Sequence, residues 1–327
     1  MRTALGIFVA MVLVGAGVAV SADANRWSAL LLHGEPLLMI AAAYATVLAR
    51  GWRRFAIALG ALLAFSAQRV PSRGFSSASE LPDWAARVRE CAEEAGAPMG
   101  PVRVMQWTLD PGVDLEVVLA RVVEQSPEIA VLQRLSEEAV AAALVAELGG
   151  EYLYRDGTAI YTRGAFNRCG DEDRWADGIR SRYAETLVFA GAASGTIFPL
   201  LVTSFPGPLD AGDWAGEMSA ATSRVAGLAQ GAMARTTIVV ADASAPRSYR
   251  HLDGAFARAG LFAAPAPPNW PTRLGSLPLL SLHPYDRLWA GEGWEVALSL
   301  RLPAWTGSRA PVLTVLRSAG QTATSAP

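Results

Sequence analysis

The pattern of apolar and polar positions predicts a strand, a helix and a second strand between residues 102 and 133. The first strand is a mostly apolar run that ends before Pro111. Asp114 is placed to cap a helix over Leu115–Gln125, where apolar residues recur at helical spacing on one face. Residues 128–133 are nearly all apolar, as in a strand that is buried on both faces. Such alternation of strands and helices is typical of an α/β domain.

The chain after this unit continues to alternate between predicted helices and strands. A helix over residues 136–148 ends at Gly149-Gly150, and Asp156-Gly157 is a strong signal for a hairpin. The later elements are strands at 186–190, 196–203 and 310–316, and helices over 213–231 and up to residue 259. The last ten residues, 318–327, are polar and predict a disordered tail.

Three apolar runs come before the domain: Ala4–Val20 with 17 residues, Trp27–Ala49, and Phe55–Ala67 with 13. A helix needs about 20 apolar residues to cross a membrane, so residues 1–69 predict two or three transmembrane helices. Residues 70–100, rich in Ser, Pro and Gly at first, predict a linker and a short helix before the domain at 101–317.

The side of the membrane on which the domain lies depends on the number of spans. If the basic cluster Arg50–Arg54 stays inside, three spans place the domain outside the cytoplasm. A signal peptide cleaved near Ala24 would also export it, whereas two spans would keep it in the cytoplasm. We expect a bacterial inner-membrane protein with an extracytoplasmic domain.

Charge and cysteine content narrow the possible partners. All 28 basic residues are arginine; residues 76–327 hold 21 of them against 28 acidic residues, a formal charge of −7. This balance disfavours a nucleic-acid partner, which is usually gripped by a basic face. Cys91 and Cys169 are the only cysteines, too few for a structural zinc site; they could pair or remain free thiols.

The central unit resembles the opening of the endonuclease/exonuclease/phosphatase superfamily. In that family the first strand ends in Trp-Asn and the second in Leu-Gln-Glu, and the Glu is the main Mg²⁺ ligand. Here the matching residues are Trp107-Thr108 and Leu132-Gln133-Arg134. The resemblance implies an α/β domain of the DNase I-like kind, a four-layer α+β sandwich of two mixed β-sheets packed face to face with helices outside.

Later segments follow the same family in order, and several of its site residues are replaced. Asp242 and Asp286 match family aspartates, whereas Ser204 stands for a phosphate-contacting His and Ser244 for an Asn. Before the last strand, Ser308-Arg309 stands where the family has the Asp-His pair that activates water. The remnant family positions are therefore Thr108, Arg134, Ser204, Asp242, Ser244, Asp286, Ser308 and Arg309.

These replacements act against metal-dependent hydrolysis. Mg²⁺ binds through hard oxygen ligands, and a guanidinium has no lone pair to offer. At about 4 Å and an effective dielectric near 20, each pair of unit charges interacts by roughly 4 kcal/mol. A divalent ion carries two such charges, so a Glu beside it is attracted by roughly 8 kcal/mol. Where Arg134 takes the place of that Glu, the attraction becomes a repulsion of similar size. Arg309 cannot accept a proton at neutral pH either.

Two functions follow as hypotheses. The first is a membrane-anchored, non-catalytic protein of this fold, without a cofactor, that binds a protein or a small anionic ligand or acts as a scaffold. Arg134 and Arg309 would then form an anion pocket, or simply neutralise Asp242 and Asp286. The alternative is a divergent Mg²⁺-dependent phosphodiesterase or phosphatase, with Asp242 and Asp286 as metal ligands. In that case Asp110, Glu128 and Glu137 are candidate substitutes for the missing ligands.

Overall fold

The computed structural model describes residues 100–167, 185–192, 197–205, 214–229, 234–243, 250–270, 273–274, 277–278 and 284–319. The expected membrane helices, residues 70–99 of the expected linker, residues 320–327 of the expected tail and both cysteines lie outside these residues. Ser318, predicted as the first residue of the disordered tail, is instead the buried last residue of strand β14 (Val312–Ser318), because it pairs with Trp294 of the neighbouring strand. Within the described ranges, no helix has the length and hydrophobicity needed to cross a membrane.

The first of two large sheets is built around the predicted central unit. Its strands run in the order β13-β14-β1-β2-β4-β3. The neighbours β1 and β2 are parallel, and the other pairs are antiparallel. The bounds are β1 Val102–Thr108, β2 Ile129–Gln133, β3 Glu151–Arg155, β4 Thr158–Thr162, β13 Trp294–Arg301 and β14 Val312–Ser318.

The second large sheet has the order β5-β6-β7-β8-β12-β9. Here β7 and β8 are parallel, and the other neighbours are antiparallel. The bounds are β5 Phe166–Asn167, β6 Glu185–Gly191, β7 Ile197–Ser204, β8 Ile238–Asp242, β9 Leu261–Ala263 and β12 Asp286–Gly291. A separate two-stranded sheet pairs β10 (Arg273–Leu274) with β11 (Leu277–Pro278).

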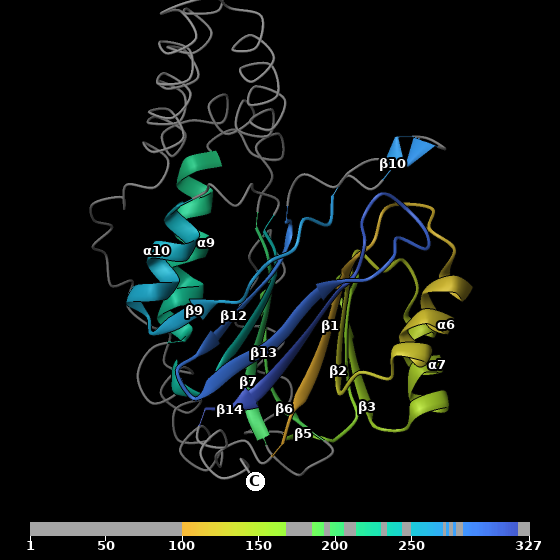
Figure 1. The fold of residues 1–327 in the computed structure, drawn as a ribbon, viewed down its shortest axis with the longest axis horizontal. Coiled ribbons are helices and arrows are strands. Elements are labelled where there is room, and N and C mark those ends of the chain that lie inside the picture. The colour runs from red at the N-terminus through yellow and green to blue at the C-terminus, as the bar shows by residue number, and fades with distance from the viewer. Residues whose placement is uncertain are drawn as a thin grey trace, which may run out of the picture.

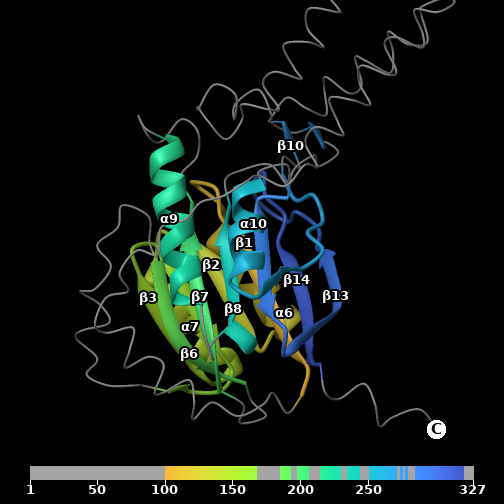
Figure 2. The same cartoon turned by 90° about the vertical axis from the view of Figure 1, so that its left-hand side faces the viewer.

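The two large sheets pack face to face, and helices cover their outer faces (Figure 1 and Figure 2). One apolar cluster lies between the sheets and includes Val131, Val202 and Leu316. The helices α6 (Leu115–Gln125) and α7 (Glu138–Leu148) pack on the first sheet through a second cluster. The helices α9 (Trp214–Leu228) and α10 (Arg250–Arg258) pack on the second sheet through a third. The predicted four-layer sandwich of two mixed sheets is therefore confirmed.

The sheet topology brings five strand ends to one end of the sandwich. The parallel pair β1 and β2 ends at Thr108 and Gln133, which are register partners. The parallel pair β7 and β8 ends at Ser204 and Asp242, also partners. The antiparallel strand β12 begins beside them, with Asp286 opposite Asp242. Arg134, directly after β2, therefore reaches the same end.

Local chemistry accounts for the starts of these elements. Asp114 has extended backbone angles and its side chain accepts hydrogen bonds from the amides of Glu116 and Val117, as the sequence predicts for the cap of α6. The hairpin of β3 and β4 turns at Asp156 and Gly157, both with positive φ. The aspartate at the first of these positions and the glycine at the second suit such a two-residue turn.

One long strand escaped the sequence analysis. The strand β13 shows no clean alternation, because a bulge between Val296 and Leu298 shifts its register against β14. Before the bulge, the side chains that face the other sheet belong to even-numbered residues, and after it they belong to odd-numbered ones. A search for strict alternation along the strand therefore fails.

Candidate functional site

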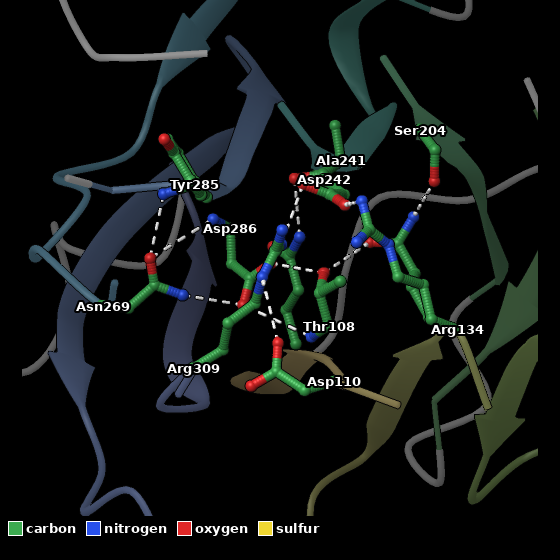
Figure 3. Close-up of polar contacts among 12 residues, drawn as sticks. Thr108, Asp110, Arg134, Ser204, Ala241, Asp242, Asn269, Tyr285, Asp286 and Arg309 are labelled. Carbon is green, nitrogen blue, oxygen red and sulfur yellow. Dashed lines mark hydrogen bonds and ion pairs between the residues drawn. The ribbon is translucent and has the colours of Figure 1, made fainter. Parts of the chain in front are cut away.

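Asp242 is the centre of the polar cluster at this end of the sandwich (Figure 3). It is the last residue of β8, and its side chain is fully buried. Arg134 Nη2 lies 2.8 Å from its Oδ2, and Arg309 Nη1 lies 3.0 Å from its Oδ1. Two guanidiniums therefore occupy the two oxygens of one carboxylate. Such charge-assisted bonds compensate for taking the carboxylate out of water.

Arg134 reaches Asp242 from the first sheet through an unusual backbone conformation. Its φ is 61°, in the left-handed region that side chains other than glycine rarely adopt. The bond from the amide of Leu135 to the carbonyl of Gly157, 2.7 Å long, fixes the chain directly after it. The side chain remains 48% exposed, so this ion pair lies partly in solvent.

Arg309 reaches Asp242 from the loop between β13 and β14, and its side chain is only 7% exposed. The peptide group that follows it is held by two hydrogen bonds: Trp107 Nε1 donates to the Arg309 carbonyl at 3.2 Å, and the Ala310 amide donates to the Asn269 carbonyl at 3.0 Å. The guanidinium carbon also lies 5.4 Å from the centre of the Tyr285 ring. Arg309 is therefore held rigidly where it is.

The electrostatics of Arg309 are set by carboxylates. Burial alone would lower its pKa, but Asp242, Asp286 and Asp110 outweigh burial and raise the pKa above the usual value. Asp110 Oδ1 lies 4.0 Å from Arg309 Nε, and its other oxygen accepts a hydrogen bond from the Ser308 amide. Arg309 is therefore permanently charged, and its side chain donates hydrogen bonds but accepts none.

Asp286 forms a second buried centre beside the first. Thr108 Oγ1 donates to its Oδ1 at 2.5 Å, the Thr108 amide to its Oδ2 at 3.3 Å, and Asn269 Nδ2 to its Oδ2 at 2.7 Å. Burial is the main cause that raises the pKa of Asp286 to about 6, with Asp242 adding to the rise. Arg309 and the two bonds from Thr108 lower it in part.

A third set of contacts ties the two sheets together next to Arg134. Gln133 Nε2 donates to the carbonyl of Thr203 at 2.8 Å and to Ser204 Oγ at 3.0 Å. Gln106 Nε2, on β1, also donates across to the second sheet, to the carbonyl of Ala241 at 2.7 Å. These buried amides hold the ends of β2 and β7 in a fixed relation and so position Arg134 against Asp242.

The structure gathers most of the residues named from the sequence. Thr108, Arg134, Ser204, Asp242, Asp286 and Arg309 lie together, and Ser308 contacts Asp110 through its backbone. Ser244 lies outside the described residues. Glu128 precedes β2, whereas Arg134 follows it, so Glu128 lies at the opposite end of the strand and cannot substitute for a ligand here.

Three members of the cluster were not predicted as site residues from the resemblance. Asn269 and Tyr285 lie in segments that resemble the family, but the resemblance assigned neither of them a role, and Asp110 was considered only as a metal ligand. Asn269 is fully buried and accepts from the Tyr285 amide at 2.9 Å, in addition to its bond to Asp286. Only the fold could have identified it, because its partners are 16 or more residues away along the chain.

The residues present do not fit a Mg²⁺ site of the family type. Both oxygens of Asp242 face guanidinium nitrogens rather than an open position. Within the described ranges, no group of three or more His, Cys, Asp and Glu side chains could hold a metal ion. A divalent ion at Asp242 would lie beside two positive charges, which is strongly unfavourable.

A surface cleft of about 560 Å³ opens beside Arg134. It lies between the loop after β1 and the loop after β2, next to the N-terminal ends of α6 and α7. Four carboxylates and a single basic side chain, Arg134, are found among the described residues that line it. The lining carboxylates are Asp110, Asp114, Glu116 and Glu137.

Comparison with known proteins identifies the fold. No protein-family model and no curated protein matches the chain. Three solved structures cover 67% of it: an endonuclease/exonuclease/phosphatase from Beutenbergia cavernae (17% identity, TM-score 0.50, 72% of that chain), D. rerio TDP2 with a single-strand DNA product (12%, 0.52, 99%), and an endonuclease/exonuclease/phosphatase from Bacteroides vulgatus (13%, 0.50, 99%). The domain therefore has the fold of the endonuclease/exonuclease/phosphatase proteins. At these identities the likeness extends to the fold alone.

Proposed function

We propose that this domain is a non-hydrolytic protein of the endonuclease/exonuclease/phosphatase fold that acts through binding, as a scaffold or ligand-binding domain. One observation supports the proposal: Arg134 and Arg309 take up both oxygens of the buried Asp242. In the related enzymes, by the resemblance of the sequence, this region holds a metal ion and a water-activating His. Here it holds an ion-pair network of two guanidiniums and two aspartates.

The network is built to be stable in the absence of a ligand. Arg309 is buried, and its loop is fixed by Trp107 and Asn269. Breaking a buried pair from one side costs roughly 3 to 5 kcal/mol, so displacing Arg309 would be expensive for any ligand. The arrangement thus favours neutralisation of Asp242 over an open anion pocket between the two arginines.

Binding would therefore take place at the surface next to the network. Arg134 is half-exposed at the edge of the cleft and keeps donors that Asp242 does not use. The surrounding carboxylates would repel a strongly anionic ligand. A protein partner or a small ligand with both charges suits this mixed lining better than nucleic acid does.

Attachment to a membrane is part of the proposal. The apolar runs Ala4–Val20 and Trp27–Ala49 support at least two spans, and the Arg50–Arg54 cluster supports an extracytoplasmic domain if there are three. Alkaline phosphatase fused after residue 100 would be active in bacterial cells if the domain is exported. An inactive fusion would support two spans and a cytoplasmic domain.

The central test is an assay of phosphodiester hydrolysis by the purified full chain. With bis(p-nitrophenyl) phosphate and Mg²⁺ or Mn²⁺, we expect no more turnover than buffer with the same metal gives. Metal-dependent turnover that Asp242→Ala abolishes would overturn the proposal in favour of the divergent hydrolase. Turnover that survives Asp242→Ala would indicate a contaminating enzyme and would leave the proposal standing.

A further inference from the structure

The two helices on the first sheet leave part of its outer face uncovered, beside the edge strand β13 (Figure 2). The apolar cluster under α6 and α7 includes Leu313 of β14, and Leu300 of β13 packs against it. Two residues further along the same strands, Leu298 and Val315 are register partners. Among the described residues, neither of them belongs to this cluster or packs against it. The helical cover therefore ends between these two pairs.

The uncovered pair points away from the second sheet. Val315 is the register partner of Arg103 in β1, and Arg103 lies between Val102 and Val104, which face the second sheet. Because side chains alternate along a strand, Arg103, Val315 and Leu298 form one row on the outer face. Leu298 is 47% exposed, and Val315 is partly exposed. An apolar contact is therefore left open here.

Charged side chains border this row. Arg103 is partly exposed, and Arg317, at the end of β14, is exposed with Glu295 of β13 opposite it in register. Two arginines and one glutamate give the border a formal charge of +1. We call Leu298, Val315, Arg103 and Arg317 the outer patch. A segment with an apolar stripe and an excess of acidic residues would be complementary to it.

Residues 83–96 of this chain have that composition. Their apolar residues recur every three or four positions, at Trp84, Val88, Cys91 and Ala95. This spacing predicts a helix with one apolar face. The segment holds four acidic residues and two arginines, a formal charge of −2, which is opposite to the charge at the border of the outer patch.

The segment also enters the domain at the correct place. Val102, the first residue of β1, pairs with Leu316 in β14. Leu298 lies two strands from β1, which corresponds to about 10 Å. The five connecting residues 97–101 can span up to about 17 Å when extended. Residues 83–96 can therefore lie across β13 and β14 while β1 stays in its place.

We propose that residues 83–96 form a helix that packs on the outer patch and extends the helical layer over β13 and β14. Its apolar face would cover Leu298 and Val315, with its acidic residues near the bordering arginines. The domain would then be held in a fixed orientation to the chain that precedes it. The contact lies on the outer face of the first sheet, so it does not depend on the proposed loss of hydrolysis at Asp242.

Disulfide trapping in the full chain tests this contact, because Cys91 belongs to the apolar face of the segment. In a Cys169→Ser background, Cys91 is the only cysteine left. Adding Leu298→Cys should give a disulfide between positions 91 and 298 under mild oxidation with copper phenanthroline, since docking brings the two side chains close. Mass spectrometry of the digested chain would identify it. The matched control is Phe262→Cys, which changes another exposed apolar residue, on β9 of the second sheet, and should give no bond with Cys91.

The reactivity of the Cys91 thiol provides a second measurement in the same Cys169→Ser background. Leu298→Asp should raise the rate of alkylation by iodoacetamide about fivefold, because a charged side chain removes the apolar contact. Phe262→Asp should leave the rate unchanged, and circular dichroism would verify that both variants fold.

Three results would overturn the proposal. A disulfide between positions 298 of two chains would show that a second copy covers the outer patch. Equal trapping of Cys91 at positions 298 and 262 would show contact without a preferred site. An alkylation rate that Leu298→Asp does not change, together with no trapping at position 298, would show that the segment does not dock.

Discussion

The guanidinium of Arg309 and the carboxylate of Asp242 form a buried ion pair across the two sheets, with 3.0 Å between Nη1 and Oδ1. The loop before β14 supplies one member, and the end of β8 supplies the other. Because both side chains are shielded from water, removing either one would leave the other as an uncompensated buried charge. Removing either side chain alone should therefore destabilise the domain, and the guanidinium occupies one oxygen of Asp242.

Replacing Arg309 should destabilise the domain strongly. Arg309→Met leaves the buried carboxylate of Asp242 with the half-exposed Arg134 alone, and we expect a loss of about 3 kcal/mol in the free energy of unfolding. Urea denaturation of the full chain, followed by tryptophan fluorescence, would measure it. Arg121→Met is the matched control: it removes a solvent-exposed pair with Glu124, 2.6 Å long, and should cost less than about 1 kcal/mol. Equal losses for the two variants would contradict this account of the pair.

Arg134 should matter less on its own and more in combination. Its side chain is 48% exposed, so Arg134→Met should cost only about 1 kcal/mol. The double variant with Arg309→Met leaves Asp242 buried with neither arginine, so its loss should exceed the sum of the single losses by at least about 1 kcal/mol. A double-mutant cycle by urea denaturation measures this coupling. Strict additivity would show that the two arginines do not share one carboxylate.

Asp286 should make stability depend on pH in an unusual direction. Burial is the main cause that raises its pKa from the usual 3.8 to about 6. Between these values the folded chain keeps a proton that the unfolded chain has released. The contribution of Asp286 to stability is thus full below about pH 4 and declines as the pH rises through 6, by about 3 kcal/mol.

The comparison that isolates this group is the wild type against Asp286→Asn. The asparagine does not titrate, so the stability of the wild type relative to the variant should fall between pH 4 and 6.5. A difference that stays constant over this range would show that Asp286 has an ordinary pKa.

Thr108 should tune the same carboxyl. Its hydroxyl donates to Asp286 Oδ1 at 2.5 Å and lowers the pKa of Asp286 by favouring the charged form. Thr108→Val keeps the shape and removes the donor, so the pKa should rise above about 6. Carbon NMR of labelled aspartate would follow the titration. An unchanged or lower pKa would mean that the hydroxyl donates elsewhere, for example to Gln133 Oε1 at 3.4 Å.

Much of the fold could be predicted from the sequence, because its signals are local. The helix α6 begins and ends at the predicted residues, since a capping aspartate and apolar spacing both act within a few residues. By contrast, β13 was missed, because its bulge is defined only against β14. The register of β13 is set by its pairing with β14 and cannot be read from the sequence of β13 alone.

In the candidate site, too, the individual residues could be predicted from the sequence, whereas their contacts could not. The resemblance singled out Arg134, Asp242, Asp286 and Arg309 one by one, each from its own segment. That both arginines bind the same carboxylate follows from sheet register and from the left-handed φ of Arg134, which no local pattern predicts. Asn269 shows the limit most clearly: it holds Asp286 and the Arg309 loop together, yet its segment resembles the family without indicating this role.

The most direct test of the central claim is calorimetric titration of Mn²⁺ into the full chain and into a variant carrying Arg134→Glu and Arg309→His. Both changes replace a guanidinium with a side chain able to bind a metal ion. If arginines occupy the metal position, the wild type should bind no Mn²⁺ that depends on Asp242, and the double variant should gain saturable binding that Asp242→Ala removes. Saturable Mn²⁺ binding by the wild type, lost in Asp242→Ala, would contradict the account.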